Sequence, residues 1–513
     1  MVALLFDPKK SYHALGFGLG RDSRMVGRTG LCLPGAPWRV AGCVREKETG
    51  MLRVDLDKVV CPEFLGVNAV YHGFAFMPFQ RERGMTDADA AREFGLISSI
   101  GLRLARTWYR PDWACGLDLH NAFDWQTVEM RAFYRWLEEM RTRGVSVALQ
   151  AGWWCTRDTC LGREKPEPAR DLPRFAEWVS ESLHQLIEVR GFSNITHLVL
   201  FTEPVNYASG LLPDGVSQTC YYGAAIRVIH ERLVADNRRH LVRTVGPNSG
   251  STTEAFWVDT AAAEYGDCID VLSWHSYNGH AFETNPPLEY AGWLNLVRQG
   301  MAKPGVASRS CWFDEYGANR PDETVRFTAD YGNYLAQAVA ALINGGCQTS
   351  LLWILMDQKY PGECTNTDSF CRGVQRWGLL PWPHDDLPDN RTPRPAWYAF
   401  GLMSRVLGGG AGHNTLWTSG EDDLHIAAVG QPAGQYAFLV VNASRAARRF
   451  DVGLNRPLRA PLARFTYDPA TICPTPEAML PGRDGEVLPA AAWTDTIPAR
   501  GVRLYQTGEL LVD

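Results

Sequence analysis

The sequence predicts an α/β fold, a (β/α)8 TIM barrel with a C-terminal antiparallel β-sandwich domain. From about residue 64 to residue 407, short β-rich runs alternate with amphipathic helical stretches. A glycine-rich segment, residues 408–412, then interrupts the chain, and short alternating runs with turn residues between them follow it. Eight β/α units over about 340 residues favour one closed barrel of parallel strands.

The expected barrel strands are eight runs rich in β-branched and aromatic residues. They are Phe64–Val70, Leu102–Thr107, Val145–Ala151, His197–Phe201, Leu241–Val245, Ile269–Trp274, Cys311–Asp314 and Ser350–Leu355. Between them, helical spacing of apolar residues predicts helices that include Trp125–Thr142, Leu172–Glu188, Cys220–Asp236, Thr324–Ile343 and Pro395–Leu407. A doubly wound open sheet is the alternative, but no glycine-rich phosphate turn follows the first strand.

A chain of 513 residues exceeds the size at which a single core stops growing, so we expect one large and one smaller domain. The catalytic barrel is expected over 61–407 and a β-sandwich accessory domain over 408–513. Residues 1–60 are poor in helix signals and could add strands to the sandwich. We expect the sandwich to buttress the barrel, because it lacks an aromatic cluster; a binding module is the alternative.

Composition excludes several classes of function. Lys and Arg number 51 against 57 Asp and Glu, a net charge of −6, whereas a nucleic-acid binder shows a basic face. No run reaches the roughly 18 apolar residues that span a bilayer, so no membrane partner is expected. Residues 1–6 are apolar, but the run ends too soon for a signal peptide, and we therefore expect a cytoplasmic protein. A homo-oligomer is possible.

Cysteine usage points to free thiols. The 13 cysteines form no framework, and no export signal precedes them. Two local pairs, Cys155/Cys160 and Cys364/Cys371, could be bridged if the protein is exported. Neither pair has the histidine spacing of a zinc site, and His72 lacks the second histidine of a His-x-His motif. We expect neither a metal nor a cofactor.

Two glutamates stand at the ends of expected strands. Glu203 follows His197–Phe201, and Glu315 closes the run that begins at Ser310. A (β/α)8 barrel places its chemistry at the carboxyl ends of its strands, and glycosidic bond cleavage needs two carboxyl groups. Asp314 precedes Glu315, and strand alternation predicts that it points the other way, in a structural role.

The other strand ends carry aromatic and hydrogen-bonding side chains. Such a wall suits a polyhydroxylated ring, with indoles for the sugar faces and amide, hydroxyl and charged groups for the hydroxyls. The candidate substrate-binding residues are Arg106, Trp108, Trp153, Thr202, Asn206, Asn248, His275, Tyr277 and Trp353.

These motifs resemble those of clan A of the glycoside hydrolases, and in particular family-five cellulases and mannanases. Thr202-Glu203-Pro204 is similar to the Asn-Glu-Pro of the clan's acid/base strand, and Glu315-Tyr316-Gly317 to its nucleophile motif. The strand-two Arg, the strand-six His-x-Tyr and the strand-eight Trp correspond to Arg106, His275 with Tyr277, and Trp353. The segment 394–400 is similar to the clan's final helix. The resemblance covers residues 64–407.

The resemblance implies a retaining β-glycoside hydrolase in which Glu315 is the nucleophile and Glu203 the acid/base, with Arg106 and Tyr277 stabilising ionised Glu315. In the clan, the Asn before the acid/base binds the sugar's 2-hydroxyl. Thr202 replaces it here, which favours mannosides over glucosides unless Asn206 or Asn248 takes its place. β-Mannosides or related β-glycosides are therefore the expected substrates. Because no signal peptide is seen, we expect an intracellular enzyme that acts in an exo mode on imported oligosaccharides or small glycosides. An endo-acting mannanase- or cellulase-like enzyme, and a carbohydrate-binding barrel that no longer hydrolyses, are the alternatives.

Overall fold

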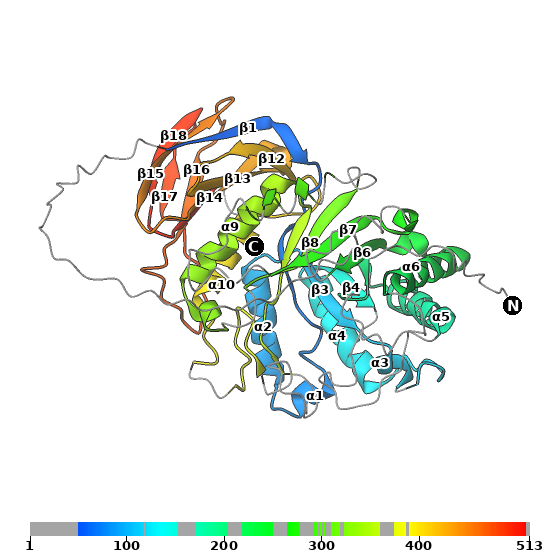
Figure 1. Ribbon diagram of the computed structural model, residues 1–513. Coiled ribbons are helices and arrows are strands. Elements are labelled where there is room, and N and C mark those ends of the chain that lie inside the picture. Colours follow the sequence, from blue (N-terminus) through cyan, green and yellow to red (C-terminus); the bar gives the residue numbers. More distant parts are fainter. Residues whose placement is uncertain are drawn as a thin grey trace, which may run out of the picture. The chain divides into compact units, whose positions relative to one another are not determined.

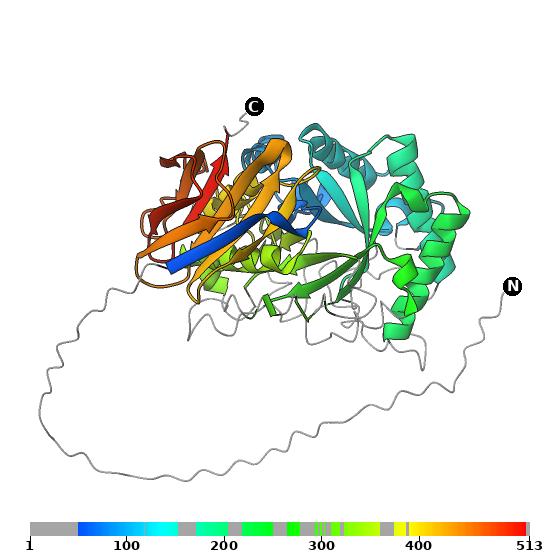
Figure 2. The same ribbon diagram turned by 90° about the horizontal axis from the view of Figure 1, so that it is seen from above.

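Eight parallel strands close into a barrel, which confirms the expected fold (Figures 1 and 2). The computed structural model describes residues 50–116, 118–151, 171–203, 218–249, 264–277, 309–318, 323–359, 374–385 and 389–508, with single positions between 292 and 302. The barrel strands are β2 (Gly66–Val70), β3 (Leu104–Tyr109), β4 (Ser146–Ala151), β5 (Ile195–Leu200), β6 (Arg243–Ser249), β7 (Val271–Ser276), β8 (Ser310–Tyr316) and β9 (Thr349–Leu352). The barrel closes where β2 pairs in parallel with β9.

The helices surround the barrel in the order that the alternating pattern predicts (Figure 1). They are α1 (Pro78–Arg81), α2 (Asp87–Ser99), α3 (Asp112–Cys115), α4 (Val128–Thr142), α5 (Leu172–Leu183), α6 (Gln218–Ala235), α9 (Asp330–Gly345) and α10 (Pro395–Leu407); a π-helical turn, His184–Val189, continues α5. Local sequence sets their starts. Thr86 and Asp89 form a capping box at α2, Thr127 caps α4, and Pro395 opens α10.

A nine-stranded sheet forms the second part of the fold, and β1 lies within it, blue among orange and red strands in Figure 2. Its strands are β1 (Gly50–Cys61), β12 (Asn414–Ser419), β13 (Leu424–Gln431), β14 (Gln435–Asn442), β15 (Arg448–Leu454), β16 (Leu462–Tyr467), β17 (Gly485–Val487), β18 (Ala492–Ile497) and β19 (Val502–Thr507). All pairs are antiparallel except β1 with β15. A separate short pair joins β10 (Gln358–Lys359) to β11 (Val374–Gln375).

The large sheet folds back on itself, which confirms the expected β-sandwich. Trp493 of the edge strand β18 packs against Phe438 of β14 and Tyr505 of β19, with ring centroids 5.5 Å apart in each case. Strands distant in the sheet order therefore share one apolar core. Helix α9 joins the barrel to this sheet, because Asn333 Nδ2 donates to Asn442 O at 3.0 Å and Asn344 Nδ2 donates to Ile426 O at 2.7 Å. In the described part of the chain, no helix has the length and apolar character of a bilayer span.

A buried ion pair holds the segment after β9 against the start of α10. Asp357 Oδ2 lies 2.6 Å from Arg394 Nη2, and Asp357 Oδ1 accepts from Gly378 N at 2.7 Å. Their side chains are 0% and 3% exposed. Arg394→Met leaves the carboxylate buried and unpaired, so we expect urea denaturation to show a loss of about 3–5 kcal/mol in the free energy of unfolding. The exposed Arg445→Met is the control, and an equal loss in both variants would contradict the prediction.

A second buried carboxyl group, Glu93 of α2, predicts a pH-dependent stability. Its Oε2 accepts from Tyr71 OH at 2.8 Å, and burial raises the pKa of Glu93 from 4.5 to about 8. The carboxyl group of Glu93 loses its proton near pH 4.5 in the unfolded chain and near pH 8 in the folded chain. The stabilisation that the protonated group contributes to the fold is therefore fully present below about pH 4.5. It is lost by ~1.4 kcal/mol per pH unit up to about pH 8. Glu93→Gln removes this loss. In urea titrations, the free energy of unfolding of the wild type should therefore fall relative to that of Glu93→Gln from about pH 5 to pH 8; a difference that stays constant with pH would contradict the prediction.

Candidate active site

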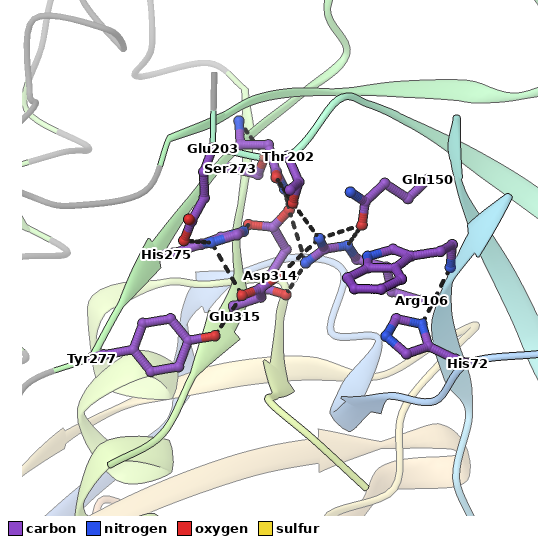
Figure 3. A network of polar contacts seen from close by, with 12 residues as sticks. His72, Arg106, Gln150, Thr202, Glu203, Ser273, His275, Tyr277, Asp314 and Glu315 are labelled. Atoms are coloured by element: carbon purple, nitrogen blue, oxygen red, sulfur yellow. Dashed lines mark hydrogen bonds and ion pairs between the residues drawn. The ribbon is translucent and has the colours of Figure 1, made fainter. Parts of the chain in front are cut away.

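The described candidate residues gather at the carboxyl ends of the barrel strands (Figure 3). Arg106 and Trp108 come from β3, Thr202 and Glu203 follow β5, and Asn248 lies near the end of β6. His275 comes from the end of β7 and Tyr277 follows that strand, Glu315 comes from β8, and Trp353 follows β9. Trp153 and Asn206 lie outside the described residues, as do both cysteine pairs.

Glu315 lies in the barrel between a cation and a hydroxyl donor. The residue is 5% exposed, and its Oε1 lies 2.8 Å from Arg106 Nη2. Its Oε2 accepts a hydrogen bond from Tyr277 OH. Burial and the Glu315 carboxylate keep the pKa of Tyr277 well above 10, so this hydroxyl stays a donor. Charge-assisted hydrogen bonds of this kind stabilise a negative charge at a fixed position.

Arg106 is fixed by hydrogen bonds of its own. The side chain is fully buried, and its Nε donates to Gln150 Oε1 at 2.9 Å. Nη1 donates to the backbone oxygen of Asp314 at 2.7 Å, and Nη2 donates to Thr202 Oγ1 at 3.0 Å. Because its neighbours hold the guanidinium on several sides, its charge is directed at Glu315 with little freedom to move.

Glu203 faces Glu315 from the opposite side of the site, on a strained turn. Its side chain is 27% exposed, and its backbone N donates to Asn248 O at 3.0 Å. Phe201, Glu203 and Asn248 all have positive φ angles, +61°, +43° and +56°. Non-glycine residues in this region cost energy and concentrate at functional sites, so the strain itself marks this turn as a candidate.

His275 lies between the two glutamates (Figure 3). Its Nδ1 is 2.9 Å from Glu203 Oε1 and 3.2 Å from Glu315 Oε2. One ligand atom from each of these three side chains lies within 4.8 Å of the other two, which places a Glu203 oxygen within 4.8 Å of a Glu315 oxygen. Burial lowers the pKa of His275 below 6.5, against the opposing charges of Glu315 and Asp314, so the ring is neutral near pH 7.

The same three side chains are the one set, within the described ranges, whose atoms are close enough to share a metal ion. Both oxygens of Glu315 already face donors, the Arg106 guanidinium and the Tyr277 hydroxyl. A cation next to that guanidinium would meet repulsion, so the site fits a carboxylate pair better than a metal. The absence of a metal stays a prediction.

Asp314 corrects one expectation from the sequence. Strand alternation predicted that it points away from Glu315, but the side chain is fully buried in the barrel, and its Oδ2 lies 3.9 Å from Arg106 Nη1. In the pairing of β7 with β8, Trp274 lies opposite Phe313 and His275 opposite Glu315, so Asp314 is an extra residue in a β-bulge. The bulge turns two consecutive carboxylates inward.

A hydrogen-bonded chain beneath the site joins Thr202 to Asp314. Thr202 Oγ1 donates to Asn248 Oδ1 at 2.9 Å, and Asn248 Nδ2 donates to Asp314 Oδ2. Both polar ends of the buried Asn248 side chain are therefore engaged within the protein. The substrate-binding roles expected for Thr202 and Asn248 stay predictions.

An aromatic wall lies on the other side of Arg106. The rings of Trp108 and Trp353 are 5.7 Å apart, and the His72 ring lies 4.1 Å from Trp108 and 5.5 Å from Trp353. Trp108 N donates to His72 Nδ1 at 3.3 Å. Burial and Arg106 lower the pKa of His72 well below 6.5, so its ring is neutral. His72 and Gln150 stood at strand ends in the sequence, but nothing there indicated that they position Trp108 and Arg106.

No protein-family model matches the chain, and no curated protein sequence matches it. Solved structures do match. A GH39 β-xylosidase from Caulobacter crescentus is 14% identical with a TM-score of 0.59, covering 90% of this chain and 100% of that one. The chain shares the fold of this enzyme. The catalytic domain of GH30 xylanase C from Talaromyces cellulolyticus (13% identity, TM-score 0.61) covers 90% and 100%, and a GH30 endoxylanase from Clostridium papyrosolvens C71 (11%, 0.60) covers 89% and 100%.

At 11–14% identity the likeness to these enzymes establishes the fold. It spans nine-tenths of the chain, and so takes in the sheet as well as the barrel. The barrel that the clan A resemblance implied is therefore confirmed.

Proposed function

We propose that the protein is a retaining β-glycoside hydrolase, with Glu315 as the nucleophile and Glu203 as the general acid and base. The observation that carries the proposal is the closeness of the two carboxyl groups, whose oxygens come within 4.8 Å of each other at the mouth of a (β/α)8 barrel. Retaining enzymes place these groups about 5–5.5 Å apart, and inverting enzymes about 6.5–9.5 Å apart, to admit a water molecule. The spacing supports retention.

In the first step, ionised Glu315 attacks the anomeric carbon while protonated Glu203 gives its proton to the departing glycosidic oxygen. A glycosyl ester forms on Glu315 as the glycosidic bond breaks. Arg106 and Tyr277 orient Glu315 through its two oxygens. They also hold its charge until it attacks.

In the second step, Glu203 has lost its proton and takes one from a water molecule, which attacks the anomeric carbon of the ester. Two inversions at that carbon give a product with the original β configuration. Glu315 is released as a carboxylate, and Glu203 regains the proton it needs for the next cycle.

For the substrate, we propose exo action on a β-mannoside or a related β-glycoside. Thr202 occupies the position at which the clan A motif has Asn, and its hydroxyl is engaged by Arg106 and Asn248. It therefore offers no amide to an equatorial 2-hydroxyl. A β-xyloside is the second candidate, because β-xylosidases are among the proteins of the same fold.

Two other functions remain as alternatives to be tested. An endo-acting enzyme would need an open cleft in place of a pocket. A carbohydrate-binding barrel without activity has no need of a buried Arg106–Glu315 pair facing a second glutamate, because leaving charges buried costs free energy. This argument favours hydrolysis.

The deciding experiment is hydrolysis of aryl β-glycosides (mannoside, xyloside, glucoside, galactoside, fucoside and glucuronide), with the product anomer read by proton NMR. We expect one sugar to be released first as its β anomer. A first-formed α anomer would contradict retention. No release from any aryl glycoside, together with cleavage within a polysaccharide, would favour the endo-acting enzyme; sugar binding by calorimetry without any cleavage would favour the binding barrel.

A further inference from the structure

A third carboxyl group lies beneath the two glutamates, on the far side of the His275 ring. Asp314 Oδ1 is 3.7 Å from His275 Nε2, and each of these buried atoms lacks a hydrogen-bond partner among the described residues. Buried polar atoms in folded proteins are nearly always paired. An approach of about half an ångström would bring the two atoms within hydrogen-bond distance and satisfy both.

The position of one proton on the His275 ring decides the protonation of Glu203. A neutral imidazole donates from one nitrogen and accepts at the other. If Nε2 carries the proton and points it at Asp314, Nδ1 is an acceptor. The groups next to Nδ1 are Glu203 Oε1 and Glu315 Oε2, at 2.9 Å and 3.2 Å. An acceptor between two carboxyl groups is stable only when one of them carries a proton.

Glu203 is the glutamate that should carry this proton. Both oxygens of Glu315 already receive donors, from Arg106 and Tyr277, so Glu315 is the one that stays ionised. We propose that Asp314 is a positioning residue that holds His275 as its Nε2–H tautomer, so that Nδ1 accepts a hydrogen bond from the protonated carboxyl group of Glu203 and keeps that side chain an acid. This inference rests on the proposed function and adds an explanation of how Glu203 keeps the proton that it needs as the acid.

The groups that face His275 support this arrangement. Glu203 and Glu315 face its Nδ1, and Asp314 faces its Nε2. Tyr277 donates to Glu315, and the Arg106 guanidinium lies near both Glu315 and Asp314. Burial raises the pKa of Asp314, while His275 and Arg106 act to lower it. Its Oδ2 accepts from Asn248 Nδ2 and faces the Arg106 guanidinium, so one oxygen of this carboxyl group already acts as an acceptor, and Oδ1 is left to face His275.

Asp314→Asn tests the inference, because an amide can donate to Nε2 and so reverse the tautomer. His275 would then donate from Nδ1 to Glu203 and favour its ionised form. We expect kcat/KM to fall on the order of 10²-fold for an aryl glycoside with a poor leaving group, and less than about 3-fold for the dinitrophenyl glycoside, which needs no acid. The basic limb of the pH profile should also shift to lower pH. An equal loss on both substrates with an unmoved profile would overturn the inference.

Two further measurements keep the test decisive. Glu93→Gln also replaces a buried carboxyl group by an amide, but outside the site. This variant should leave the dependence of kcat/KM on the leaving group unchanged. Nitrogen-15 NMR of the wild-type histidines, with His275 assigned from a His275→Gln variant, should find the Nε2–H tautomer; the Nδ1–H tautomer would overturn the inference even if Asp314→Asn fails to fold. A wild type that cleaves no glycoside would count against the proposed function, whereas the tautomer would still report on Asp314.

Discussion

Glu315→Gly is expected to reduce kcat on the best aryl glycoside by about 10⁴-fold or more, which corresponds to an increase of at least ~5.5 kcal/mol in the activation free energy. Without this carboxylate no glycosyl ester can form. The Arg106 guanidinium and the Tyr277 hydroxyl, which contact its two oxygens, would then face empty space. The loss should appear in kcat, because the interaction that disappears is made with the reacting carbon.

Azide makes this loss diagnostic. A small anion can enter the space left by the Glu315 side chain and attack the anomeric carbon from the same side. Azide should therefore restore part of the activity of Glu315→Gly and give the α-glycosyl azide, since only one inversion occurs. A β-azide product, or activity close to that of the wild type without azide, would contradict the assignment of Glu315.

Covalent trapping provides a matched control. A 2-deoxy-2-fluoroglycoside with a good leaving group should add one sugar to the wild-type protein, and proteolysis should place the added mass on the peptide that contains Glu315. Glu315→Gly should stay unlabelled, while Glu93→Gln, with its buried change outside the site, should label as fast as the wild type. Label found on Glu203 would reverse the assigned roles.

The barrel could be predicted because its strands are buried on both faces. Such strands are continuous runs of apolar and β-branched residues, and all eight expected runs overlap the observed strands. The ends of the strands were predicted less well. The expected strand Leu241–Val245 is observed as Arg243–Ser249, because its pairing with neighbouring strands continues into polar residues near the candidate site. The sequence pattern thus located the strands, and Glu203 and Glu315 lie near the ends of two of them.

The environment of the site could not be predicted from local pattern. The bulge that turns Asp314 inward depends on the register between β7 and β8, and no feature of residues 310–316 signals it. Nor does the local sequence signal the positive φ angles of Phe201 and Asn248, which are not glycines. The hydrogen bond from Arg106 to Gln150 joins residues 44 positions apart. Each is a tertiary constraint that overrides a local preference.

Glu203→Ala is expected to act differently from Glu315→Gly, because it removes the acid and base but leaves the nucleophile. For an aryl glycoside with a poor leaving group, kcat/KM should fall about 10²–10⁴-fold, the usual contribution of a positioned proton donor. For the dinitrophenyl glycoside kcat/KM should change little, since that leaving group departs without a proton. Steady-state assays across a series of aryl leaving groups would measure both.

The second step separates the two glutamates completely. With the dinitrophenyl glycoside, the ester on Glu315 should form quickly in Glu203→Ala and then accumulate, because no base activates water. A burst of released phenol should therefore precede slow turnover. Azide needs no base, so it should speed this turnover and give the β-glycosyl azide, opposite in configuration to the product of Glu315→Gly. If both variants gave the same azide anomer, the two glutamates could not hold the separate positions proposed for them, on either side of one anomeric carbon.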